Sequence, residues 1–271
     1  MPPYAASQTV PVVVVTGGSD GIGREIALRF ARSGKHVLLV ARDAERLERA
    51  AVAIRDGLPA RSAVELGILP LDVTTSGAPE AIEAHVARIG GHVEILVNSA
   101  GIGLSGDFDG PSAEDIDRLL ALNIAALTQL MRHFLPGMRT RRSGGVINIA
   151  SLGGYVPGPY QAVYYASKAY VISLSEAVAS EVAGDGVRVL VVSPGPVATA
   201  FHARMGAERS LYRRLMPAAT PASVARWALL AYSLHLRVVV PGLINTVLFA
   251  SLRILPHRLV IPVVAWLLRP R

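Results

Sequence analysis

Blocks of apolar residues alternate with amphipathic segments along the first 200 residues of the chain. The apolar, β-branched blocks predict buried strands near residues 9–16, 36–41, 64–71, 93–97, 145–149 and 187–192. The segments between them have helical spacing: in residues 21–34, Ile22, Ile26 and Phe30 share one face, and Asp43 is the expected N-cap of the next helix. Strict alternation of strands and helices predicts an α/β fold, a single Rossmann-like, doubly wound parallel sheet with helices on both faces.

The C-terminal segment has a different pattern, because it is apolar almost throughout. One helical face would carry Ile244, Val247, Leu248, Ser251, Leu252 and Leu255. Asn245, Thr246 and Arg253 would lie on another face, Pro256 would end this helix, and Pro262 lies inside a second one.

These patterns predict a catalytic domain over residues 1–242 and an apolar, basic helical extension over residues 243–271. The longest charge-free runs of the extension, 238–252 and 259–268, are shorter than the ~20 residues that span a bilayer. We expect the extension to pack over the substrate entrance or a subunit contact. A hairpin that lies on an anionic membrane is the alternative.

Composition and charge exclude several classes of function. The chain has no cysteine, which excludes disulfides and thiolate catalysis, and we expect no metal site. Nine arginines and no acidic residue follow Glu208, so the net charge of +7 belongs to the C-terminal quarter. Because this basic region is apolar and lacks a glycine-rich arm, we expect no nucleic-acid partner. The N-terminus has no secretory pattern, so we expect a cytoplasmic protein with peripheral membrane contact as the further alternative.

The first candidate chemistry is the segment TGGSDGIG, residues 16–23. Gly17, Gly21 and Gly23 lie between a predicted strand and a predicted helix, where glycine lets the backbone approach a pyrophosphate at the helix N-terminus. This context predicts a dinucleotide site.

The end of the second predicted strand favours NADP(H) over NAD(H). The strand ends in Arg42 with no preceding acid, and a basic residue here accommodates a 2′-phosphate. Asp20 in the glycine-rich turn argues for NAD(H), since it would repel that phosphate unless it pairs with Arg42 or points to solvent.

The second candidate chemistry is YYASKAY, residues 164–170. Lysine occurs in this chain only at Lys35 and Lys168. Tyr164 and Lys168 have the i, i+4 spacing of one helical face, and a neighbouring ammonium favours a phenolate. Ser151 ends a predicted strand at the sheet edge where open α/β sheets bind ligands.

Together these motifs resemble the short-chain dehydrogenase/reductase family over residues 9–200. The resemblance implies a catalytic set of Asn123, Ser151, Tyr164 and Lys168. It implies a cofactor site made of Thr16, Gly17, Ser19, Asp20, Gly21, Ile22, Gly23, Arg42, Asp72, Val73, Asn98, Ala100, Gly101, Tyr164, Lys168, Pro194, Gly195, Val197 and Thr199. Ser99 replaces the second asparagine of the family's NNAG motif.

The resemblance also implies a role for each catalytic residue in hydride transfer between a nicotinamide and a ketone or secondary alcohol. Ser151 would hold the carbonyl oxygen, and Tyr164 would donate or remove the proton. Lys168 would lower the Tyr164 pKa and hold the ribose, while Asn123 would hold a water.

The substrate and the partners are less strongly indicated. TGGSDGIG, LVAR and the long tail resemble very-long-chain 3-oxoacyl-CoA reductases and 3-ketodihydrosphingosine reductases, which implies a lipid-like ketone, NADPH and a homodimer or homotetramer. A hydroxysteroid-type dehydrogenase and a membrane-associated NADP-binding scaffold are the alternatives. The arginines of the expected substrate-binding segment fit either a phosphate-bearing carrier or a solvated helix face: Arg204, Arg209, Arg213 and Arg214. We expect His202 to lie at the surface.

Overall fold

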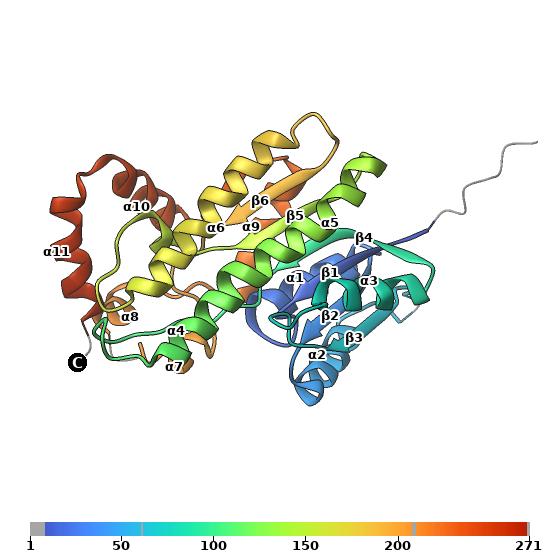
Figure 1. Ribbon diagram of the computed structural model, residues 1–271, viewed down its shortest axis with the longest axis horizontal. Coiled ribbons are helices and arrows are strands. Elements are labelled where there is room, and N and C mark those ends of the chain that lie inside the picture. Colours follow the sequence, from blue (N-terminus) through green and yellow to red (C-terminus); the bar gives the residue numbers. More distant parts are fainter. Residues whose placement is uncertain (1–8, 61, 208–209, 270–271) are drawn as a thin grey trace, which may run out of the picture.

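The computed structural model describes residues 9–60, 62–207 and 210–269, which form a seven-stranded parallel sheet in the order β3-β2-β1-β4-β5-β6-β7 (Figure 1). The strands are β1 Val10–Thr16, β2 His36–Ala41, β3 Leu66–Pro70, β4 Gly91–Asn98, β5 Gly145–Ile149, β6 Arg188–Val192 and β7 Val238–Val239. The chain winds outward from β1 in one direction and from β4 in the other, so a crevice forms where these strands end. The predicted doubly wound sheet is confirmed.

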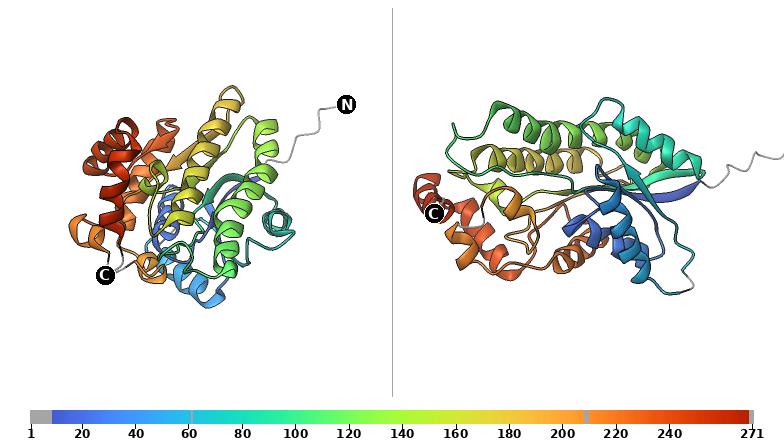
Figure 2. Two further views of the ribbon diagram at one scale, coloured as in Figure 1. Left: turned by 60° about the vertical axis from the view of Figure 1, so that its left-hand side comes forward. Right: turned by 90° about the horizontal axis from the view of Figure 1, so that it is seen from below.

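Helices cover both faces of this sheet (Figure 2). One face carries α1 Gly21–Arg32, α2 Ala44–Asp56 and α9 Pro221–Ser233, and the other carries α3 Ala78–Arg88, α5 Leu127–Arg141 and α6 Ala162–Glu181. Successive side chains of β1 alternate between the two faces: Val13 and Val15 pack in one core, Val12 and Val14 in the other. Both faces are therefore buried, which explains the continuous apolar runs of the strands.

Side-chain caps fix where two of these helices begin. The Asp43 carboxylate accepts a hydrogen bond from the Arg46 N–H at 3.0 Å, which confirms Asp43 as the N-cap of α2. Asp20 caps α1 through the Gly21 N–H at 2.7 Å. The start of α1 therefore lies at the carboxyl end of β1, where the glycine-rich turn joins the two.

The C-terminal extension forms two helices, α10 Leu243–Ile254 and α11 His257–Leu268, with Pro256 between them as predicted. They lie at the end of the molecule that also carries α7 Phe201–Arg204, α8 Leu211–Leu215 and the short 3-10 turn η2 Leu152–Tyr155 (Figure 1). Phe249 packs edge-on against Tyr155, with 4.6 Å between the ring centroids. Among the residues described, none of the helices combines the length and the apolar character that crossing a membrane requires.

The predicted inward face of α10 is wrong at its first turn. Ile244 and Val247 are 62% and 67% exposed, whereas Asn245 is half-buried. The Asn245 amide donates to the Pro241 carbonyl at 2.8 Å and lies against Gly195, where an added Cβ would be 2.6 Å from Asn245 Oδ1. A polar side chain thus faces inward here because it binds the backbone that precedes its own helix.

Candidate active site

A cavity of about 500 Å³ extends from the glycine-rich turn, past the carboxyl ends of the central strands, to the inner faces of α10 and α11. Most of the residues expected to bind the cofactor line it: Gly17, Ser19, Asp20, Gly21, Ile22, Ala100, Gly101, Tyr164, Lys168, Pro194, Gly195, Val197 and Thr199. Ser151 lines it as well. Segments far apart in the sequence therefore share one cavity.

The glycine-rich turn fits a dinucleotide. Gly17 and Gly21 have φ angles of +66° and +55°, which favour glycine. A Cβ at Gly17 would lie 2.8 Å from the Ala100 nitrogen, and one at Gly21 would lie 3.2 Å from the Thr199 methyl group. Side chains would close the crevice between the start of α1 and residues 194–199, and the free N–H groups of a helix N-terminus suit a diphosphate.

Several expected cofactor residues lie outside the cavity and support its walls. The Thr16 hydroxyl accepts hydrogen bonds from the Ser99 and Ala100 N–H groups at 3.2 and 3.3 Å, which fixes the turn after β4. A Cβ at Gly23 would be 2.5 Å from the Gly17 carbonyl oxygen. Asn98, which donates to Asn148 Oδ1 at 2.9 Å, and the core residue Val73 also belong to this group. Arg42 and Asp72 are not among the lining residues either.

Asp20 pairs with two arginines, and neither is the expected Arg42. Arg46 Nη2 and Arg204 Nη2 lie 3.0 and 3.2 Å from Asp20 Oδ2. Arg42 instead faces Asp72, with 3.7 Å between Nη1 and Oδ2. The predicted pairing of Asp20 with Arg42 is wrong, because α2 and α7 each bring a guanidinium to the glycine-rich turn, although the Asp20 side chain keeps 42% of its surface exposed. The two positive charges offset the repulsion that Asp20 would exert on a phosphate.

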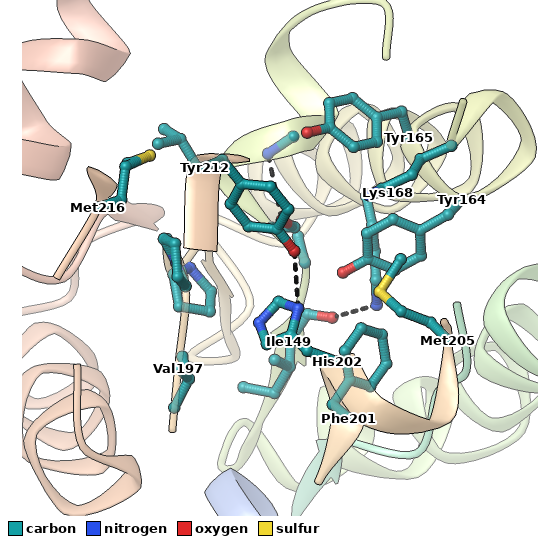
Figure 3. Close-up of a pocket in the computed structure, with 18 of the residues that line it drawn as sticks. Ile149, Tyr164, Tyr165, Lys168, Val197, Phe201, His202, Met205, Tyr212 and Met216 are labelled. Carbon is teal, nitrogen blue, oxygen red and sulfur yellow. Dashed lines mark hydrogen bonds between the residues drawn. The ribbon is translucent and has the colours of Figure 1, made fainter. Parts of the chain in front are cut away.

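Tyr164 and Lys168 lie together on α6, and both are buried. The Lys168 ammonium is 5.8 Å from the centre of the Tyr164 ring and donates to the Ile149 carbonyl at 2.9 Å (Figure 3). Ser151 follows β5 and begins η2, where its hydroxyl accepts from the Gly153 N–H at 3.1 Å. A tyrosine, a lysine and a serine therefore meet at the end of β5.

Tyr165 has a packing environment of its own. Its ring lies against two glycines: added Cβ atoms at Gly153 and Gly158 would lie 2.8 and 2.3 Å from ring carbons. Figure 3 shows the Tyr164 hydroxyl beside the Lys168 ammonium and the Tyr165 hydroxyl away from it. The two adjacent tyrosines thus differ: one faces the lysine, and the other fills the space that the glycines leave.

Burial dominates the protonation of the Tyr164 and Lys168 pair. Desolvation raises the pKa of Tyr164 well above its ordinary value, although a hydrogen bond with Ser151 opposes the rise. Desolvation also lowers the pKa of Lys168 to about 8. Burial is therefore the larger influence on the Tyr164 pKa in the chain by itself, and the lowering of that pKa by the Lys168 ammonium stays a prediction.

Asn123 lies in the π-helical turn η1 Ala121–Ala126, between α4 Ala113–Leu120 and α5. Its Oδ1 accepts from the Ile102 N–H at 3.0 Å, and its amide donates to the Ile102 carbonyl and the Ser167 hydroxyl at 2.8 and 3.1 Å. Asn123 therefore ties the loop after β4 to α6, next to Lys168.

Two polar groups of the cavity were missed from the sequence. Gln161 is 4% exposed and lines the cavity, and its Nε2 has no hydrogen-bond partner within the described residues. Its position three residues before Tyr164 was the available signal. His202 was expected at the surface but is half-buried, because Tyr212 of α8 approaches it, with 2.8 Å between the hydroxyl and Nδ1 (Figure 3).

The arginines of the expected substrate-binding segment do not form one described group. Arg204 is engaged with Asp20. Arg209 and the side chains of Arg213 and Arg214 lie outside the described residues. A site for a phosphate-bearing carrier at these positions stays a prediction.

Comparisons with known proteins agree with this geometry. The family model for short chain dehydrogenases matches residues 11–210. An uncharacterised oxidoreductase of Staphylococcus epidermidis is 34% identical over 189 residues, which are 69% of this chain and 78% of the relative. The ketoacyl reductase HetN of a Nostoc species is 34% identical over 189 residues, 70% of this chain and 64% of the relative. A short-chain dehydrogenase from Sphingobium yanoikuyae, solved in complex with NADPH, has a TM-score of 0.79 and 33% identity, and the match covers 90% of this chain and 92% of that one. The chain therefore belongs to the short-chain dehydrogenase/reductase family of NAD(P)-dependent oxidoreductases.

Proposed function

We propose that the protein is an NADPH-dependent ketoreductase for hydrophobic, lipid-like ketones, with Tyr164 as the proton donor. One observation carries the proposal: Tyr164, Lys168 and Ser151 line a cavity whose far wall consists of aliphatic side chains from α10 and α11. The ketoacyl reductase name of the Nostoc relative supports the same class of reaction.

The residues that would hold the cofactor follow the cavity. The start of α1 would bind the diphosphate, Val197 and Thr199 the nicotinamide amide, and Lys168 the ribose hydroxyls. We assign Arg42 to the 2′-phosphate, together with Arg46, which Asp20 holds near the glycine-rich turn. Bound NADPH supplies the hydride.

The side chains supply polarisation and the proton. The Ser151 hydroxyl donates a hydrogen bond to the substrate carbonyl oxygen. The Tyr164 phenol is protonated at neutral pH, as an ordinary phenol is, and can act as the acid toward that oxygen. Lys168, with a pKa of about 8, is mostly an ammonium at pH 7 and stabilises the phenolate that proton transfer leaves behind.

The walls of the cavity favour an apolar substrate. Beyond Tyr164 the lining includes Leu248, Leu252, Leu255, Val260, Val264 and Leu267. We propose that residues 1–242 form the catalytic domain and that residues 243–271 close its cavity. The unpartnered Gln161 amide would donate to a second substrate oxygen, as a 3-oxoacyl group provides, since a buried donor without a partner is costly.

The test is NADPH oxidation, followed by the nicotinamide absorbance, with 3-oxo esters of increasing chain length. Each methylene that enters the aliphatic cavity contributes about 0.8 kcal/mol, so kcat/KM should rise about fourfold per methylene until the cavity is filled. A preference for short polar ketones would contradict the lipid-like assignment. Binding of NADPH without turnover on any ketone would favour the scaffold alternative.

A further inference from the structure

We propose that the outer face of the α10–α11 pair docks on an anionic lipid bilayer, an interaction that the proposed enzymatic function does not require. This outer face consists of exposed apolar residues that do not line the cavity: Leu243, Ile244, Val247, Ile254 and Trp266. They are 81%, 62%, 67%, 82% and 54% exposed, respectively. Apolar residues gathered on one exposed face mark an interaction site rather than ordinary scattered surface residues.

The outer face continues into the cavity. Leu255, Leu259 and Val263 are 46%, 58% and 56% exposed and also line the cavity, so they form its rim. The opposite sides of the helices, with Leu252 and Val260 among others, line the interior. Helices that carry apolar residues on two opposite sides need apolar surroundings on both. The protein supplies them on the inner side only.

The positive charge of the C-terminal quarter favours an anionic partner for this face. No acidic residue follows Glu208, while nine arginines do, which exceeds the net charge of +7 of the whole chain. Arg258 is exposed on α11, and Arg269 is exposed directly after its last residue. An apolar helix face with arginines and no acids complements the hydrocarbon boundary and the negative headgroups of an anionic bilayer.

A second copy of this chain fits the face less well. A twofold interface would bring the same patch of each copy together, and with it two sets of arginines without acidic partners. Geometry also favours lying on a bilayer. Each helix has 12 residues and is therefore about 18 Å long, shorter than the ~30 Å hydrocarbon core. The pair would lie in the plane of the headgroups.

This placement gives the cavity a direct route to lipid. The rim residues Leu255, Leu259 and Val263 would touch the bilayer, so a lipid-like ketone would enter the cavity without crossing water. The route rests on the proposed function, whereas docking itself does not.

Vesicle sedimentation tests the docking. The full-length protein is mixed with vesicles of phosphatidylglycerol and phosphatidylcholine, or of phosphatidylcholine alone, at low and high salt. The test variant is Val247→Glu/Ile254→Glu, and the matched control is Val52→Glu/Ile89→Glu. The control residues are 50% and 43% exposed and belong to α2 and the end of α3, at the opposite end of the molecule (Figure 1).

We expect binding to anionic vesicles that weakens with salt and is weaker on neutral ones. Removal of two exposed apolar side chains from contact with lipid should lower binding at least about tenfold, and the control should bind like the parent. Brominated lipid should quench the fluorescence of Trp266, and Trp266→Phe should lose that quenching while Trp227 keeps its emission.

Equal binding by the two double variants, or no binding to anionic vesicles, would overturn the proposal. A parent that ignores vesicles and is dimeric, while Val247→Glu/Ile254→Glu is monomeric, would overturn it in favour of a subunit contact. Because Val247 and Ile254 do not line the cavity, turnover of a short water-soluble ketone should be equal in all forms. A failure of the proposed function would appear in that turnover and not in sedimentation.

Discussion

Replacement of Lys168 by methionine should stabilise the protein at pH 7 although it removes a residue of the candidate active site. Lys168 is 7% exposed, and burial lowers its pKa from 10.5 to about 8. That difference corresponds to about 3 kcal/mol of unfolding free energy lost at pH 7, where the ammonium is charged in both states. The variant also loses the hydrogen bond from Lys168 to the Ile149 carbonyl, which lowers its stability by about 1.5 kcal/mol or more. We therefore expect a net stabilisation of about 1 kcal/mol.

The pH dependence of this difference is the sharper signature. Between pH 8 and 10.5 the unfolded parent binds a proton at Lys168 that the folded parent has released, so the parent gains stability as the pH rises. The Lys168→Met variant has no such group. The variant should be more stable than the parent by about 1 kcal/mol below pH 8. This difference should change by about 3 kcal/mol as the pH approaches 10.5, so the parent becomes the more stable protein there.

Urea-induced unfolding of parent and variant at pH 7, 8, 9 and 10 measures the difference. Lys35→Met, at the only other lysine of the chain, is the control for the loss of one positive charge. A difference between Lys168→Met and the parent that does not change with pH would refute the argument, because burial of the ammonium would then not be its cause. A large destabilisation at pH 7 would show that the bond to Ile149 outweighs desolvation.

Two further substitutions test the cofactor and substrate assignments. Arg42→Ala should raise the Kd for NADPH about ten- to a hundredfold, because it removes a charge-assisted contact, and should leave the Kd for NADH unchanged. Calorimetric titration with both nucleotides measures the two constants. An equal effect on both would exclude a contact between Arg42 and the 2′-phosphate. Gln161→Leu should raise KM about tenfold for a 3-oxo ester but not for a ketone of equal length without the second oxygen. Steady-state kinetics on the two substrates decides, and equal changes would point to a packing role.

Local patterns predicted most of the fold. The limits of β2 and β5 coincide with the predicted strands 36–41 and 145–149. Strands that are buried on both faces have continuous apolar sequences, so their first and last residues can be predicted without knowledge of distant residues. The cap at Asp43 was predictable for the same reason, since it involves only neighbours in the sequence.

Features that depend on distant segments could not be predicted in this way. Arg46 and Arg204 reach Asp20 from 26 and 184 residues away, and only the assembled fold shows that both do. Helical periodicity indicates which residues of α10 share a face, but not which face turns inward. The orientation of α10 follows from Asn245, which donates a hydrogen bond to the Pro241 carbonyl and contacts Gly195. The apolar Ile244 is exposed as a result.

The central claim is that Tyr164, and not its neighbour Tyr165, is the proton donor of a working reductase. The most direct measurement compares Tyr164→Phe and Tyr165→Phe in NADPH-dependent reduction of a long-chain 3-oxo ester, with NADPH binding followed in parallel. Tyr164→Phe should lose about 10²–10⁴ in kcat and still bind NADPH, because only the acid is removed. Tyr165→Phe should keep most of its turnover, since the Tyr165 ring fills the space beside Gly153 and Gly158. An inactive Tyr165→Phe beside an active Tyr164→Phe would contradict the account.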